Sequence, residues 1–280
     1  MRREAVATAC AACVLAVAGA PAAATAGLDP ARFSDPATID NAWFPLAPGT
    51  QFTLAGSANR GEGQRRHRVV FTVPAPPPPP PPPRALVLWD RDYNGGRLEE
   101  GELTFHAQDD AGTVWNLGEY PEEYEHGRLT GAPDTWIAGL SRARAGILML
   151  ADPHVGTPSY LQGWAPDIGF ADRARVLRTG VRSCVPVRCY GDVLVTDEWN
   201  PAEPGAHQRK FYTRGVGNIR VGAAGHDTEG EVLVLERVRH MSAGARSWVR
   251  KEALKLDRRA YRVKADLYRH TPPAEPMTAP

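Results

Sequence analysis

The sequence predicts a mainly β protein: a curved antiparallel sheet or partial β-barrel with one C-terminal amphipathic helix. Short segments rich in valine and aromatic residues recur along the chain, separated by Gly, Pro, Asn and Asp turns. Several of these segments alternate, as Val69, Phe71 and Val73 do, which is the pattern of a strand with one buried face. Only the chain after residue 241 changes to a helical period.

The first 26 residues have the composition of a secretory signal peptide. Two arginines precede an alanine-rich apolar stretch at residues 5–18, and small residues follow up to Ala26. Pro21 interrupts this stretch before it reaches the roughly 20 residues that a spanning helix needs. We therefore predict cleavage near Ala26 and a location outside the cell or on the exterior of its envelope.

The charge composition of the mature chain limits the classes of partner that it can bind. Cleavage removes two of the 33 basic and one of the 32 acidic side chains, which leaves 31 of each. This balance argues against a nucleic-acid partner held by phosphate neutralisation. We place the antiparallel β domain at residues 27–241, the helix packed on it at 242–270, and a disordered tail at 271–280.

Nine strands are expected in the β domain, and their spacing favours antiparallel hairpins in one sheet. They cover residues 67–73, 84–90, 101–107, 113–118, 175–181, 192–199, 208–213, 217–221 and 231–238. A tract at residues 74–83 ends in eight consecutive prolines, which predict a polyproline II rod roughly 25 Å long. Such a rod cannot join a sheet, so we expect a stiff loop, with recognition by an aromatic groove as the alternative.

Cys184 and Cys189 are the only cysteines in the mature chain, with four residues between them. In an exported protein this spacing predicts a disulfide, which contributes roughly 2 kcal/mol in the chain-entropy model. A zinc site would need further ligands, and the mature chain contains no CxxC or HxxxH pair to supply them.

The C-terminal segment predicts a helix that begins near Ser242 and ends before Thr271. Six apolar residues follow one another at steps of four or three and form one stripe: Val249, Ala253, Leu256, Ala260, Val263 and Leu267. We expect this stripe to pack across the open side of the sheet. Residues 246–269 carry nine basic and three acidic side chains, so attachment to an anionic membrane surface is the alternative.

Residues 90–125 carry eleven acidic side chains against two basic ones. Within them, Asp109 and Asp110 are weak candidates for a metal site. A calcium loop starting at Asp109 would need oxygen ligands where the chain has Ala111, Thr113 and Tyr120, so we expect a hairpin turn instead. We expect the basic 246–269 surface and this acidic one to face each other or to lie in solvent.

Catalytic signatures are missing from the sequence. It contains no GxSxG, SxxK, HExxH or phosphate-binding loop, and its eight histidines are scattered singly. Glu119, Glu122 and Glu123 could supply the carboxylate pair of an extracellular hydrolase, although a solvated acidic loop explains them equally well. We therefore predict no catalytic residue and no cofactor, and lean against an enzyme.

Two motifs resemble a family of uncharacterised exported bacterial proteins: WFPLAPGT at residues 43–50 and FYTRGVGNI at residues 211–219. The resemblance covers most of residues 40–240. No activity is established for that family, so the resemblance assigns no site residue. The proline tract and the two cysteines depart from its pattern at positions where we expect loops.

These observations lead to one functional hypothesis and two alternatives. The first is a non-catalytic exported protein that binds a lipid or other apolar ligand in a half-barrel pocket. A carboxylate-dependent hydrolase and a membrane-surface protein that binds through its basic helix are the alternatives. Ligand identity and oligomeric state do not follow from the sequence.

Overall fold

A computed structural model describes residues 28–74 and 84–274 of the chain. The predicted signal peptide, the proline tract after Pro74 and the end of the predicted tail lie outside the described residues. Within those residues, no helix combines the length and the apolar character needed to cross a membrane.

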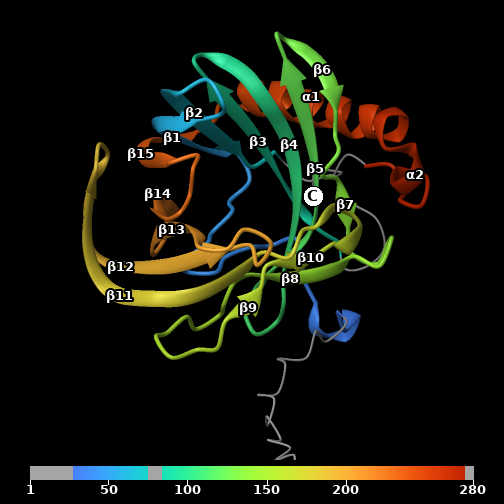
Figure 1. Ribbon diagram of the computed structural model, residues 1–280. Coiled ribbons are helices and arrows are strands. Elements are labelled where there is room, and N and C mark those ends of the chain that lie inside the picture. Colours follow the sequence, from blue (N-terminus) through green and yellow to red (C-terminus); the bar gives the residue numbers. More distant parts are fainter. Residues whose placement is uncertain (1–27, 75–83, 275–280) are drawn as a thin grey trace, which may run out of the picture.

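All strands belong to one antiparallel sheet, as predicted (Figure 1). Its order is β10-β8-β5-β4-β3-β2-β1-β15-β14-β13-β12-β11-β9, and β6 and β7 pair with β5. The strands are β1 Thr50–Asn59, β2 Gln64–Thr72, β3 Leu86–Asn94, β4 Arg97–Gln108, β5 Val114–Glu125, β6 Arg128–Gly131, β7 Trp136–Ile137, β8 Arg144–Met149, β9 Tyr160–Leu161, β10 Gly163–Trp164, β11 Arg173–Val185, β12 Arg188–Trp199, β13 Ala206–Thr213, β14 Gly217–Gly225 and β15 Val232–His240.

The sheet curls into a nearly closed barrel. Its two ends, β9 and β10, are consecutive in the chain and separated only by Gln162, so they lie next to each other. In the middle of the order, β1 pairs with β15 and joins the N-terminal strands to the C-terminal ones. Gly56 makes this seam possible, because a Cβ there would lie 1.8 Å from the carbonyl oxygen of Val232.

Each of the nine predicted segments lies largely within a strand, but the strands are longer than predicted and six others were missed. β1 was not predicted, because residues 55–59, AGSAN, are small or polar. The largest correction concerns residues 119–125, which continue β5 instead of forming a solvated loop. Pairing with β4 on one side and with β6 and β7 on the other stabilises them as strand.

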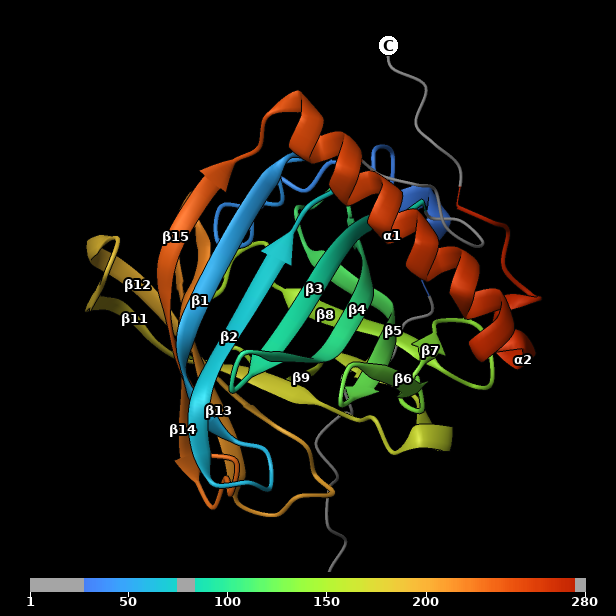
Figure 2. The ribbon, with the colours of Figure 1, turned by 90° about the horizontal axis from the view of Figure 1, so that it is seen from above.

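The C-terminal helix packs on the convex face of the sheet, not across its open side (Figure 2). It comprises α1, Ala243–Val263, with Ser242 as N-cap, and a short α2, Ala265–Tyr268, after a break at Lys264. Its apolar stripe contacts residues that point outward from β3, β4 and β5, such as Val87, Leu103 and Tyr120. These outward positions are apolar, which explains why the helix covers this face.

One buried ion pair fastens the helix to the sheet. The Glu122 side chain on β5 is fully buried and accepts hydrogen bonds from the hydroxyls of Tyr120 and Tyr124, at 2.7 and 2.6 Å. Arg259 on α1 donates to both oxygens of the same carboxylate. The basic helix and the acidic segment therefore meet at this point, but most of the acidic residues of β3–β5 lie elsewhere.

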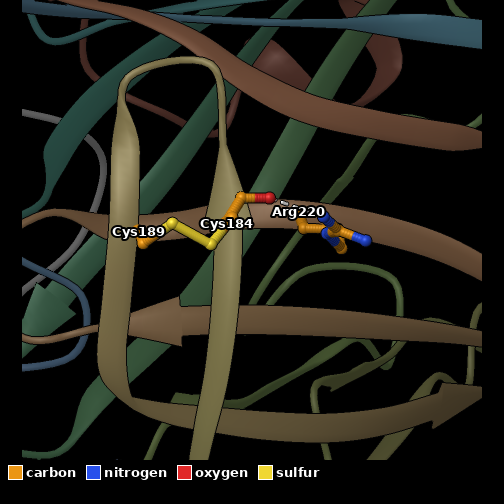
Figure 3. Close-up of a disulfide and its surroundings, with 3 residues drawn as sticks. All are labelled: Cys184, Cys189 and Arg220. Carbon is orange, nitrogen blue, oxygen red and sulfur yellow. Dashed lines mark hydrogen bonds between the residues drawn. A yellow bond between two sulfur atoms is a disulfide. The ribbon is translucent and has the colours of Figure 1, made fainter.

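The predicted disulfide joins Cys184 and Cys189 at the tip of the long β11–β12 hairpin (Figure 3). The two cysteines are directly paired in the register of the hairpin. Arg220 on β14 donates a 2.8 Å hydrogen bond to the carbonyl oxygen of Cys184, which ties the tip to a strand beyond the hairpin.

Candidate functional site

The concave side of the sheet encloses a cavity of about 290 Å³. It is lined from both halves of the sheet, by β1–β5 and β8 on one side and by β13–β15 on the other. Apolar side chains form much of its wall: Phe44, Leu46, Phe52, Val69, Phe71, Leu88, Leu148, Val216, Val221 and Leu233. The volume lies at the lower end of pockets that hold small molecules.

Strand alternation places carboxyl groups on the same concave face. On β3 the inward positions run from Leu88 to Asp90 and Asp92, and on β4 they include Glu102. Asp90 lies directly opposite Glu102 in the β3–β4 register, and like charges at such positions repel each other. Glu119 on β5 completes this acidic wall.

Burial and mutual repulsion raise the pKa values of these carboxyl groups. Desolvation, followed by repulsion from Glu119, raises the pKa of Glu102 well above its ordinary value. Desolvation and the charge of Asp92 likewise raise the pKa of Asp90. The pKa of Glu119 is also raised by burial, although hydrogen bonds from Asn116 and Trp136 oppose this. A carboxyl group whose pKa is raised binds a proton more readily, and a protonated carboxyl group can donate as well as accept hydrogen bonds.

Five carboxyl groups line the cavity: Asp90, Asp92, Glu102, Glu119 and Glu231. Lys210 on β13 is the one lysine or arginine among the described residues that line it. Its ammonium group lies 2.8 Å from Glu198, so its charge is already paired. A neighbouring hollow of about 450 Å³ shares Gln208 and Lys210 with the cavity and is lined by further carboxylates, including Asp172 and Glu203. Carboxyl groups therefore outnumber lysine and arginine side chains along the lining of the cavity and of this hollow.

A histidine lies behind the acidic wall. His67 on β2 has a fully buried side chain, and its Nε2 lies 3.0 Å from Asp92 Oδ1 and 3.1 Å from Glu231 Oε1. Burial alone would lower the pKa of His67, but the contacts with these two carboxylates raise it to about 9. Arg60 lies 3.5 Å from the other oxygen of Asp92.

The candidates named from the sequence occupy other positions. Asp109 caps the β4–β5 turn: it accepts hydrogen bonds from the backbone of Ala111 and Thr113, from Trp115 Nε1 and from Arg32. Both oxygens of its carboxylate are engaged in these contacts. Asp110 is exposed, and hydrogen bonds from Ser34 lower its pKa.

The three glutamates proposed for a hydrolase are not brought together. Glu119 lines the cavity, whereas Glu122 lies on the convex face with Arg259. Glu123 borders a separate, open hollow at the β3–β4 turn. Among the four carboxyl groups that share the cavity with Glu119 is Glu102, on the neighbouring strand.

No protein-family model matches the chain, and no curated protein gives a significant match. Two solved structures are similar, both with a TM-score of 0.39. One, from Bacteroides fragilis, is described as an exported protein with a YmcC-like fold, with 14% identity over 70% of this chain and 98% of that one. The other, described as a lipoprotein from Parabacteroides distasonis, has 10% identity over 72% of this chain and 99% of that one. The predicted family resemblance therefore stays a prediction.

Sequence reasoning missed His67, Asp90, Asp92 and Glu231. A signal for part of this wall was present, because Leu86, Leu88, Asp90 and Asp92 stand at alternate positions of one segment. Continuing that strand by four residues would have placed both aspartates on one face. Glu231 comes from more than 130 residues further along the chain, and only the sheet order brings it to His67.

Proposed function

We propose that the protein is an exported, non-catalytic binding protein that holds a small amphipathic molecule in its barrel cavity. The observation that carries the proposal is the cavity itself, which is lined by apolar side chains and by five carboxyl groups. The apolar part of the ligand would lie against residues such as Phe52, Leu88 and Leu233. A hydroxyl or amine group would meet Glu102 and Asp90, where a buried polar partner satisfies groups that otherwise remain unpaired.

The cavity limits the size of the ligand. A volume of about 290 Å³ accommodates a single short acyl chain or a molecule of similar size, and excludes a lipid with two chains. Export is supported by the composition of residues 1–26 and by the disulfide, because disulfides persist in oxidising compartments.

Native mass spectrometry of protein purified from its exported form tests the proposal. We expect a stoichiometric extra mass that is released on denaturation, and displacement of the apolar probe N-phenyl-1-naphthylamine by the released compound. Leu88→Trp fills the cavity and should abolish both signals, whereas Val238→Trp on the exposed part of β15 should retain them. A bare mass together with no probe binding to a folded wild-type protein would refute the proposal.

A second candidate, a carboxylate-dependent hydrolase, is favoured by one observation. Glu102 and Glu119 lie diagonally across neighbouring strands and line the same cavity, and such enzymes use two carboxyl groups that face one substrate. Turnover of chromogenic glycosides that disappears in both Glu102→Gln and Glu119→Gln would support this candidate. Activity that is unchanged in these variants would exclude these two residues as its source.

The alternative of membrane attachment stays a prediction, but the apolar stripe of the helix is occupied. Val249, Ala253, Leu256 and Ala260 are buried against the sheet, so the surface of α1 offers mainly its basic side chains. Flotation with anionic vesicles at low and high salt tests the remaining electrostatic contribution.

A further inference from the structure

From the geometry around His67 we infer a binding site for one first-row divalent metal ion on the wall of the barrel cavity. Its protein ligands are Nε2 of His67, Oδ1 of Asp92 and Oε1 of Glu231, which lie within 4.8 Å of one another. The inference does not depend on the proposed amphipathic ligand.

The three donor atoms lie close together, and two of them lack a hydrogen bond. His67 Nε2 lies 3.0 and 3.1 Å from the two oxygens, yet neither this nitrogen nor Asp92 Oδ1 has a hydrogen-bond partner among the described residues. The nitrogen is therefore close to both oxygens but is aimed squarely at neither. A tetrahedral ion with bonds of about 2.0–2.1 Å needs donors roughly 3.3 Å apart, so each of the two nitrogen–oxygen distances has to lengthen by only a few tenths of an ångström.

Neighbouring side chains hold the two carboxylates in place. Gln208 donates a 2.9 Å hydrogen bond to the second oxygen of Glu231. Arg60 donates to the second oxygen of Asp92 at 3.5 Å. Gln208 leaves the oxygen of Glu231 that faces His67 available, whereas Arg60 also lies 3.7 Å from that oxygen. Outer groups that orient metal ligands contact them in this way.

The position also gives the ion a way in and open coordination sites. His67 is fully buried, but Asp92 and Glu231 line the cavity, so an ion between them faces the cavity on one side. Water or a polar group of a ligand can complete its coordination.

The ligand set indicates the class of metal. One imidazole nitrogen and two carboxylate oxygens suit Zn²⁺, Mn²⁺ or Fe²⁺ better than Ca²⁺, which takes six to eight oxygen ligands, or Cu⁺, which prefers sulfur. We therefore use Zn²⁺ and its spectroscopic substitute Co²⁺ as probes.

Equilibrium titration of the metal-free mature protein with Zn²⁺ tests the site. We expect one ion per chain, and binding at least about tenfold weaker in Asp92→Asn and Glu231→Gln, which preserve side-chain volume. His154→Gln is the control, because His154 and Asp152 form an exposed pair on another part of the surface. The Co²⁺ visible spectrum should show nitrogen and oxygen ligation in the wild type and in His154→Gln, and change in both site variants.

Three outcomes would overturn the inference. The first is wild-type protein that binds no stoichiometric Zn²⁺, which would mean that the three residues form an imidazolium ion pair only. The second is equal affinity in the wild type and Asp92→Asn. The third is loss of binding in His154→Gln alone, which would move the ion to the surface. Circular dichroism of each variant separates these results from unfolding.

Discussion

The ion pair between Glu122 and Arg259 provides the sharpest test of how the helix is held. Arg259→Met removes the guanidinium from a carboxylate that is fully buried, while methionine keeps a similar helix propensity and much of the side-chain volume. The hydroxyls of Tyr120 and Tyr124 still donate to Glu122, but its negative charge loses its counter-charge.

The structure sets the size of the effect. Removing one partner of a buried ion pair costs about 3–5 kcal/mol, and the arginine is 29% exposed, so we expect the lower limit of about 3 kcal/mol. For a domain of this size that loss lowers Tm by roughly 6–12 °C. Replacing both residues, as Glu122→Gln with Arg259→Met, removes the buried charge and should restore about 1 kcal/mol or more relative to the sum of the single changes.

Urea unfolding followed by tryptophan fluorescence measures these free energies. The matched control is Arg262→Met, an exposed arginine one turn further along α1. If Arg259→Met cost no more than about 0.5 kcal/mol beyond this control, Glu122 would be screened by water and the ion pair would not hold the helix.

Two further predictions concern the barrel. Burial lowers the pKa of His106 to about 4. As pH falls from 6.5 to 4, mainly the unfolded chain takes up a proton at this residue, so the free energy of unfolding should fall by about 3 kcal/mol on account of His106. The difference in unfolding free energy between the wild type and His106→Gln, followed across this pH range, measures this loss. A difference that does not vary with pH would contradict the prediction. Gly56→Ala should cost about 3 kcal/mol or more by forcing β1 from β15, whereas Gly222→Ala on β14, with open space at its Cβ, should change stability by less than about 1 kcal/mol. If the two glycine changes had equal effects on thermal unfolding, the β1–β15 pairing would tolerate a side chain at position 56.

The local features of this protein follow from its sequence. Alternating valines and aromatics specify strands, the apolar stripe from Val249 to Leu267 specifies a helix, and the spacing of Cys184 and Cys189 allows a disulfide in a hairpin. Each of these depends on contacts between residues near one another in the chain, or on a period that one segment displays by itself. For the same reason Asp109 could be assigned to a turn, since its capping contacts lie mostly within a few residues.

Only the tertiary structure decided which face of the sheet each charge occupies. From the sequence, residues 90–125 were expected to form one acidic surface. In the curved sheet, Asp90, Glu102 and Glu119 instead line the cavity, and Glu122 contacts the helix. The order of the strands then brings Glu231 beside His67, across more than 160 residues of chain. Burial shifts the protonation of these groups because desolvation depends on all the surrounding elements, so the chemistry of the cavity wall is a property of the closed barrel and not of any one segment.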